Sequence, residues 1–403
     1  MVPRIAIATP CHPTAPASRT LRTGPGTRQP HGQLQAWRVG GIIAFMTFAP
    51  ASPIYASRFL LALLGSMMPI AGYLLENNYH AFLVTFLIIP GLDWLAGRDQ
   101  SNAAPEGQER LEASQFFRAI LYLYAPIQLG LIGWGAWVVT HENLPPMENL
   151  GLMLSIGIVT GAQGITIAHE LGHKPSRADR ALAQLLLVTV SYGHFCIEHN
   201  RGHHVRVATP DDPATARYGE AFWRFLPRTV IGSYRSAWTL ARERLQRLGL
   251  PVSSWRNQML WFSALPIVIG GALGMALGPL AAALFFVQSA MAITLLEIVN
   301  YVEHYGLVRK KLADGRYERV DVRHSWDADN LITNCFLIHL QRHADHHTHP
   351  TRPYQALRHI DASPKLPAGY AGMIPLAMVP PLWFAVMNPR VEALRQDHAV
   401  QHR

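Results

Sequence analysis

Six apolar segments, each close to the length that a helix needs to cross a lipid bilayer, constrain this chain more than any other feature. A bilayer core is crossed by about 20 predominantly apolar helical residues. The segments are 58–75, 79–96, 116–139, 150–168, 260–277 and 280–299. Only 15% of the residues are charged, whereas soluble domains carry about a quarter. The sequence therefore predicts an all-α membrane protein with six transmembrane helices.

Lysine and arginine predict which ends of these helices face the cytoplasm. The short turns after the first, third and fifth segments contain neither residue, whereas 26 of the 35 basic residues lie in 174–256 or beyond residue 300. By the positive-inside rule these basic regions are cytoplasmic. We therefore expect a multi-pass protein of the cell inner membrane. The basic residues are dispersed and accompany no DNA-binding motif, so we expect no nucleic-acid partner.

The remaining segments suggest one membrane domain with a tail at each end. Residues 1–50 are rich in Pro, Thr, Arg and Gly and are predicted to be disordered. Because Met46 is an alternative start, it stays open whether residues 1–45 belong to the native protein. Residues 51–390 form the predicted single membrane-embedded domain, and 391–403 a tail. Two further apolar stretches are predicted as a buried or interfacial helix (181–196) and, because of its prolines, a re-entrant or surface-lying segment (366–387).

Nine histidines stand in four short clusters at or just beyond the ends of the fourth and sixth segments. The clusters read HELGH, EHNRGHH, NYVEHYG and QRHADHH. They contain His169, His173, His199, His203, His204, His304, His343, His346 and His347. Imidazole binds iron, zinc and copper, and nine imidazoles can fill the shells of two ions. The sequence therefore predicts a cytoplasmic, histidine-rich helical cap that holds two metal ions.

The spacing of these histidines suggests how they share the ions. Residues four apart lie on one face of an α-helix. The pairs His169/His173, His199/His203 and His343/His347 have this spacing, so each pair can hold one ion from one helix. His204 and His347 directly follow another histidine and point about 100° away from it, so they can serve a second ion. Spacing alone does not assign the histidines to the ions.

Polar residues beside the histidines are predicted to orient the imidazole rings. A metal-binding histidine usually donates its other ring N–H to a carboxylate or carbonyl, which fixes the tautomer. The candidates are Glu170, Glu198, Glu303, Asp345 and Asn300. Whether one of the carboxylates binds a metal ion directly stays open.

Two other classes of protein are consistent with part of the pattern. HELGH is an HExxH motif, in which zinc proteases use two histidines and a glutamate base. A zinc protease needs about three protein ligands, which leaves the other clusters unexplained. A metal transporter would be expected to place ionisable ligands inside its spans, whereas these lie mostly beyond the ends.

Longer motifs around the histidines resemble those of the alkane 1-monooxygenases, a family of integral-membrane alkane hydroxylases. The resemblance rests on HELGHK (169–174), EHNRGHH (198–204), NYVEHYGL (300–307) and LQRHADHH (340–347), supported by ATPDDPATAR (208–217) and HPTRPYQALR (349–358). Membrane desaturases and sterol or fatty-acid hydroxylases share the generic histidine pattern, and NYVEHYGL distinguishes this family from them.

The resemblance implies terminal hydroxylation of medium- or long-chain n-alkanes to 1-alkanols. It implies O2 as oxidant, two non-haem irons bound by the nine histidines, and electrons from a rubredoxin that an NADH-dependent reductase reduces. Hydroxylation of other unactivated methyl groups, as in alkylbenzenes, and acyl-chain desaturation stay open as alternatives. An alkane methyl group offers no site for acid–base chemistry, so a redox-active metal is needed, which zinc is not.

Two expectations concern the substrate and the electron donor. Phe82, Phe86 and Trp94 in the second segment are candidates to limit the chain length of an alkane that enters from the bilayer, although contact with lipid or core packing is the favoured role for each one individually. The chain has three cysteines and no CxxC pair, so electrons must come from another protein. Arg201, Arg206, Arg342 and Arg352 are candidates to dock an acidic donor.

Overall fold

The computed structural model describes residues 52–401, and these residues form helices joined by turns and loops, without a β-sheet. Backbone pairing between extended residues is limited to isolated bridges within this part of the chain. The all-α prediction is therefore confirmed for the described residues. The predicted disordered segment, 1–50, lies outside them.

Four helices are long and apolar enough to cross a bilayer. They are α8 (Gln115–His141), which follows α7 (Pro105–Ala113); the continuous helix formed by α9 (Pro146–Val159), η2 (Thr160–Ile165) and α10 (Thr166–Gly172); α15 (Gln258–Leu277); and α16 (Pro279–His304). They coincide with the predicted third to sixth segments.

The first two predicted segments have a different structure from a straight span. The first comprises α2 (Pro53–Ser57), α3 (Leu60–Gly65) and α4 (Met68–Leu74), with a bend of 53° between α3 and α4. Pro69 lies in the first turn of α4, and proline cannot donate the backbone hydrogen bond that would continue the preceding helix. The second comprises α5 (His80–Leu83), η1 (Val84–Ile88) and α6 (Ile89–Ala96). Together they form an apolar helix that is shorter than the candidate spans. The structure thus has four candidate spans, or five if the bent pair is one, and a count of six stays a prediction.

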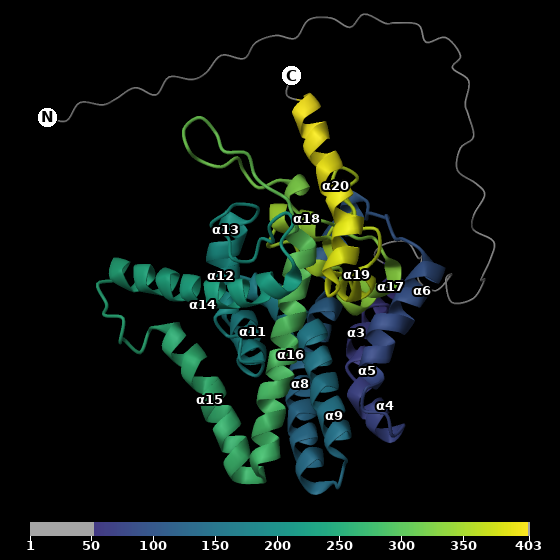
Figure 1. Cartoon of the computed structure of the whole chain (residues 1–403), viewed down its shortest axis with the longest axis vertical. Helices are drawn as coiled ribbons and strands as arrows, with labels where there is room; N and C mark the ends of the chain where they lie inside the picture. Colours follow the sequence, from purple (N-terminus) through teal and green to yellow (C-terminus); the bar gives the residue numbers. More distant parts are fainter. Residues whose placement is uncertain (1–51, 402–403) are drawn as a thin grey trace, which may run out of the picture. The chain divides into compact units, whose positions relative to one another are not determined.

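The helix α16 lies at the centre of the bundle, against α8, α9 and α15 (Figure 1). Gly157 and Gly161 allow it to approach closely, since a Cβ atom at either position would come within 2.8 Å of Met291 or Ala292 on α16. Small residues are common where membrane helices pack closely. α10 and the end of α16 both carry histidines, and this close packing holds them next to each other.

One long helix runs across the bundle axis rather than along it (Figure 1). This helix, α14 (Phe222–Arg247), buries a narrow stripe at every fourth residue, from Phe225 through Thr229 and Ser233 to Ala237. Arginines occupy much of its opposite face. The pattern is typical of an amphipathic helix that lies in a membrane interface, and the sequence predicted this region only as part of a basic cytoplasmic segment.

A set of mostly short helices, together with the longer α20, covers the end of the bundle where the histidines lie. They are α11 (Arg177–Val188), α12 (Phe195–Glu198), η3 (His199–His203), α13 (His204–Arg206), η4 (Val322–His324), α17 (Leu331–Phe336), α18 (His343–Thr348), η5 (Tyr354–Ala356), α19 (Tyr370–Ala377) and α20 (Pro380–Gln401). Residues 391–401, predicted as part of a tail, continue α20. The side chain of Trp383 on α20 is fully buried against the rings of Tyr301 and Tyr305.

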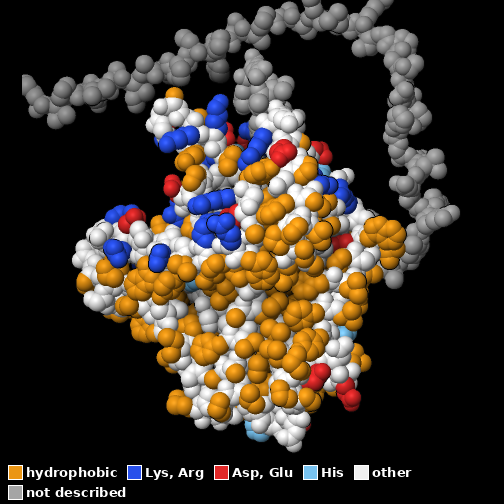
Figure 2. All heavy atoms as spheres, viewed as in Figure 1, with side chains coloured by type: hydrophobic (Ala, Val, Ile, Leu, Met, Phe, Trp, Pro, Cys, Tyr) orange, Lys and Arg blue, Asp and Glu red, His pale blue; other side chains and the backbone are white. Residues whose placement is uncertain are grey.

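Charge divides the surface into two regions. In Figure 2, lysine and arginine side chains gather on the half that carries the short helices, and the other half is covered mainly by hydrophobic side chains. Large apolar residues such as Trp137, Ile267 and Met275 are exposed on the long helices. An exposed apolar surface of this extent is expected of a protein that contacts lipid.

Candidate metal centre

The structure brings all nine predicted histidines together. His169 and His173 come from α10 and its end, His199 to His204 from η3 and α13, His304 from the last turn of α16, and the remaining three from α18. Seven of the nine are buried, and His173 and His204 are half-buried. The outermost two, His169 and His347, are 178 positions apart in the sequence, so distant segments of the chain contribute to one site.

The nine imidazoles form two groups. The first group contains His169, His173, His199, His204 and His346. The second contains His203, His304, His343 and His347. Within each group the potential ligand atoms all lie within 4.8 Å of one another.

Distances between ring nitrogens in the first group fit the shell of a metal ion. The Nε2 atom of His199 lies 3.1 Å from that of His173 and 3.0 Å from that of His204, and the Nε2 atoms of His204 and His346 are 3.2 Å apart. With metal–nitrogen bonds of about 2.1 Å, two ligands at right angles are about 3.0 Å apart and opposite ligands about 4.2 Å. The three observed separations match the value for ligands at right angles.

The second group has the same geometry. The Nε2 atom of His343 lies 3.2 Å from that of His304 and 2.9 Å from that of His347. The Nε2 atom of His203 is buried and has no hydrogen-bond partner. Several nitrogen lone pairs that face one another repel unless a cation lies between them, so the donor set fits a metal ion in each group.

A π-helical turn explains why the predicted pairing of His199 with His203 is wrong. These residues lie in η3, a π-helix, in which hydrogen bonds join residues five apart rather than four. His199 therefore shares a group with His204, and His203 turns toward the second group. On α18, His343 and His347 share a group as predicted, and His346 joins the first group.

Burial keeps most of these imidazoles neutral. It lowers the pKa of His199, His204 and His346 well below the ordinary value, and the neighbouring histidines lower it further. The pKa values of His343 and His347 are lowered for the same reasons. The neutral form is the one that binds a metal.

His203 differs because a carboxylate holds its ring. Burial disfavours its charged form, but the Asp212 carboxylate outweighs burial and raises the pKa of His203. Its Nδ1 lies 2.9 Å from Asp212 Oδ2, which also accepts a hydrogen bond of 2.6 Å from the Thr215 hydroxyl. Asp212 therefore fixes the tautomer that leaves Nε2 free for a metal. The sequence analysis missed this residue, although it lies in the quoted motif ATPDDPATAR.

The predicted carboxylates mostly have other partners. Glu170 pairs with Lys174 at 2.6 Å, Glu198 with Arg206 at 2.7 Å, and Asp345 with Arg352. Each of the three directly neighbours a histidine in a helix, so its side chain points about 100° away from that histidine. In that direction the lysine or arginine partner neutralises its charge.

Glu303 and Asn300 lie nearer to the histidines. Glu303 Oε2 is 3.2 Å from His343 Nε2, and its Oε1 is buried without a hydrogen-bond partner. The amide of Asn300 donates a hydrogen bond of 3.2 Å to Glu297. Both side chains face a pocket that borders the two histidine groups.

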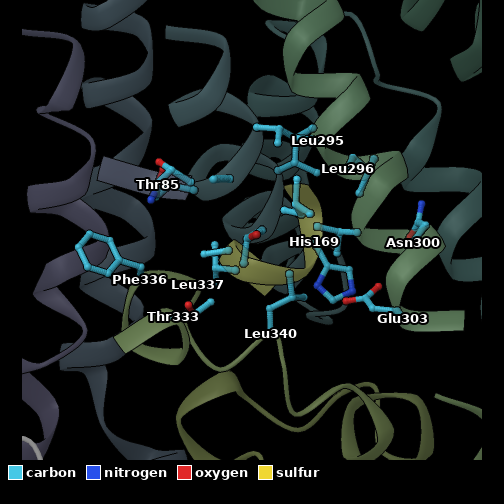
Figure 3. A pocket seen from close by; sticks show the side chains of 18 of the residues that line it. Thr85, His169, Leu295, Leu296, Asn300, Glu303, Thr333, Phe336, Leu337 and Leu340 are labelled. Atoms are coloured by element: carbon cyan, nitrogen blue, oxygen red, sulfur yellow. The ribbon is translucent and has the colours of Figure 1, made fainter. Parts of the chain in front are cut away.

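The space in and around this pocket, with the open region at its mouth counted, is about 840 Å³. Its walls come mainly from apolar residues of η2, α16, α17 and α19, among them Ile165, Leu295, Phe336 and Ile374. His169, His199 and His343 contribute to its lining. In Figure 3, His169, Asn300 and Glu303 lie at one end of the pocket, and Thr85 and Phe336 lie at the opposite end. An apolar chain can therefore extend away from the histidines.

The three candidates for the substrate channel do not line this pocket. Phe82 and Phe86 pack against a hydrophobic core cluster and against each other, with ring centroids 6.2 Å apart, and Trp94 is 83% exposed. The same segment instead contributes Thr85 and Ile89. The π-helical turn η1 (Val84–Ile88) shifts the helix face here, so α-helical periodicity does not predict the lining residues.

Fold and site together define a class: a helical membrane protein with clustered histidines that can bind metal. The family model described as fatty acid desaturase matches residues 146–377. The chain is 48% identical over 312 residues to alkane 1-monooxygenase 2 of Pseudomonas aeruginosa, an alignment that covers 77% of this chain and 83% of the relative. It is 43% identical over 361 residues to alkane 1-monooxygenase 1 of the same species, covering 87% and 94%.

A more distant similarity, 26% identity over 300 residues, relates the chain to the hydroxylase component of a xylene/toluene monooxygenase of Pseudomonas putida, covering 73% and 80%. The chain belongs to the fatty acid desaturase family and, within it, to the alkane 1-monooxygenases. The resemblance inferred from the histidine motifs is thereby confirmed.

Proposed function

We propose that this chain hydroxylates the terminal methyl group of medium- and long-chain n-alkanes, with O2 as oxidant and two non-haem iron ions held by the nine histidines. The observation that carries the proposal is the pair of imidazole groups at the wall of an apolar pocket, in a chain 48% identical to an alkane 1-monooxygenase. Five histidines would hold one iron and four the other. Bound iron supplies the redox chemistry that activates O2.

The chain's own residues position the substrate and keep the site dry. Leucines and isoleucines of the pocket bind an alkyl chain by the hydrophobic effect and exclude water from the reacting methyl group. His169 and Glu303 lie at the end of the pocket where that methyl group would be attacked (Figure 3). The overall reaction consumes the alkane, O2, two electrons and two protons and yields a 1-alkanol and water.

Reconstitution tests this function. Purified protein, supplied with iron, O2, rubredoxin, an NADH-dependent reductase and NADH, is expected to convert octane to 1-octanol. An alkene product would favour a desaturase. Product from toluene but none from any n-alkane would favour hydroxylation of methyl groups on aromatic rings, as the name of the more distant relative suggests.

Asp212→Asn is expected to weaken iron binding by about 10–100-fold, the usual effect of removing the partner that orients a metal-binding histidine. The amide loses the negative charge that holds His203 Nδ1–H, so Nε2 is oriented less firmly. Competition with a chelator measures the affinity. Asp211→Asn, an exposed neighbour, is the matched control, and an equal loss in both variants would contradict the role of Asp212.

The proposed orientation places the histidines on the cytoplasmic side of the inner membrane, where a soluble donor can reach them. Three of the four predicted docking arginines fit this role poorly, whereas Arg201 is exposed. Arg342 is 2% exposed and donates to the carbonyl oxygens of Leu357, Asp99 and Ser101. As described above, Arg206 and Arg352 each pair with a carboxylate.

A groove elsewhere has better access to the site. It is lined by residues of 306–324 and of α20, including Arg309, Lys310, Arg323 and Arg395, with Glu318 as an acidic residue among them. His324 also lines the groove, and its carbonyl oxygen lies 3.3 Å from His304 Nδ1. One residue thus separates the groove from the second histidine group. We place the acidic rubredoxin here because its charge complements that of the groove.

Lys310→Glu is expected to raise the KM for reduced rubredoxin roughly fivefold to tenfold, because exposed interface charges mainly affect association. The rate with wild-type protein should fall as ionic strength rises. Arg242→Glu, also exposed but outside the groove, is the control. Salt-independent turnover, or an equal rise in KM in the control, would contradict this docking position.

A further inference from the structure

The far end of the apolar pocket contains two polar atoms that the chain leaves unsatisfied. Gln163 is only 3% exposed, and its Oε1 atom has no hydrogen-bond partner. The hydroxyl of Thr85 is likewise buried without a partner. Both residues line the pocket. Because buried polar groups are nearly always hydrogen-bonded, this pair of atoms indicates that a polar ligand group belongs there.

These two polar atoms lie away from the histidines. Thr85 stands at the end of the pocket opposite His169 and Glu303 (Figure 3). Gln163 precedes His169 by six residues in one continuous helix, which corresponds to about 9 Å along the axis. A Cβ atom built on Gly65 would lie 2.8 Å from a ring carbon of Phe336 and 3.4 Å from Gln163 Nε2. Gln163 therefore borders Phe336, which Figure 3 places at the same end as Thr85.

The walls between the two ends are apolar. Leu296 and Leu337 lie along this stretch in Figure 3. The hydroxyl of Thr333, which also faces the pocket, already donates to Asp93. An alkyl chain fits between the histidines and the polar end, and only its last atoms would meet Gln163 and Thr85.

The donors and acceptors at the polar end select one kind of ligand group. Gln163 Oε1 accepts hydrogen bonds and cannot donate them, whereas the Thr85 hydroxyl does both. A substrate hydroxyl can donate to Gln163 Oε1 and accept from Thr85, so it satisfies both atoms. An ether or ester oxygen only accepts and leaves Gln163 unsatisfied.

We propose that Gln163 and Thr85 form a binding site for the hydroxyl group of a 1-alkanol, whose far methyl group then lies beside the histidines. The proposal rests on the proposed function and extends its substrates from alkanes to primary alcohols. The reaction has the same stoichiometry as alkane hydroxylation: the alkanol, O2, two electrons from the same donor and two protons yield an α,ω-diol and water. The product of the first hydroxylation can thus return, reversed in the pocket, as a substrate.

The test compares 1-alkanols with n-alkanes and 1-methoxyalkanes of matched length, with products identified by mass spectrometry. The wild-type protein is expected to form α,ω-diols and to prefer the alkanol over the methoxyalkane. Gln163→Leu and Thr85→Val, which keep the side-chain size, are each expected to lower the ratio of kcat/KM for alkanol to that for alkane about tenfold. An unchanged ratio in both variants overturns the proposal, as does a wild-type protein that hydroxylates alkanes without forming any diol.

Alkane turnover in the same preparations separates this proposal from the proposed function. If no substrate is hydroxylated, the proposed function fails. The hydroxyl-binding site of Gln163 and Thr85 is then tested separately, by ligand binding without turnover. The protein as purified, kept without O2 and electron donor so that no turnover occurs, should be stabilised against heat by 1-decanol more than by 1-methoxynonane, and Gln163→Leu should remove the difference. Equal stabilisation by both compounds in the wild-type protein overturns the proposal.

Discussion

His346→Ala and His347→Ala are each expected to abolish alkane hydroxylation, and each is expected to lose a different iron. The two residues are adjacent in the chain but belong to different histidine groups. Since loss of an outer-shell partner already costs about 10–100-fold in affinity or activity, loss of a ligand should lower activity more than about 100-fold. Mössbauer spectra of iron-loaded protein should show two signals in the wild type, one of which each variant retains.

His349→Ala is the matched control for this pair. His349 lies in the same segment, its side chain is 54% exposed, and it belongs to neither group. It is expected to keep both irons and the activity. Loss of the same signal in His346→Ala and His347→Ala would contradict the division into groups of five and four.

Thr85→Trp is expected to shorten the alkanes that the protein accepts. Thr85 lines the end of the pocket that lies opposite His169 and Glu303 (Figure 3), and an indole ring there would fill the space that the last carbons of a long chain need. Overfilling a packed space is costly, so kcat/KM for hexadecane should fall more than about 100-fold and that for octane much less. A profile of kcat/KM against chain length measures the shift.

Trp94→Ala provides the control in the same segment. Trp94 is 83% exposed and does not line the pocket, so its replacement should leave the profile unchanged. If Trp94→Ala shifts the profile and Thr85→Trp does not, the substrate chain occupies some other part of the protein.

Hydropathy predicted the long helices well and the short broken ones less well. The predicted segments 260–277 and 280–299 match α15 and α16 closely, because their apolar runs are continuous and end at Gly278 and Pro279. The segment 58–75 also contains a continuous apolar run, yet the chain bends by 53° within it. Hydropathy does not report the effect of a proline such as Pro69 on the direction of a helix.

The histidine clusters were predictable, but their division between two ions was not. Imidazole is rare enough that nine in four clusters indicate a shared site, and the structure brings all nine together. The division depends on η3, where π-helical hydrogen bonds replace α-helical ones. A spacing of four residues indicates α-helical pairing and does not identify such a turn, so it suggested His199 as the partner of His203.

The same limit applies to the residues around the site. Glu170 and Glu198 were chosen because they stand beside histidines in sequence, whereas neighbours in a helix point in different directions. Asp212 comes from a loop and reaches His203 from nine residues away. Its role depends on tertiary structure, and its presence in a motif shared with the family was the signal that could have identified it.

The metal content of the purified protein decides whether the nine histidines hold two irons. Iron and zinc should be determined per chain, and X-ray absorption should identify the atoms bound to the metal. We expect two irons per chain, each bound mainly by imidazole nitrogens, and little zinc. One metal ion per chain, or zinc in place of iron in active protein, would rule out the two-iron site.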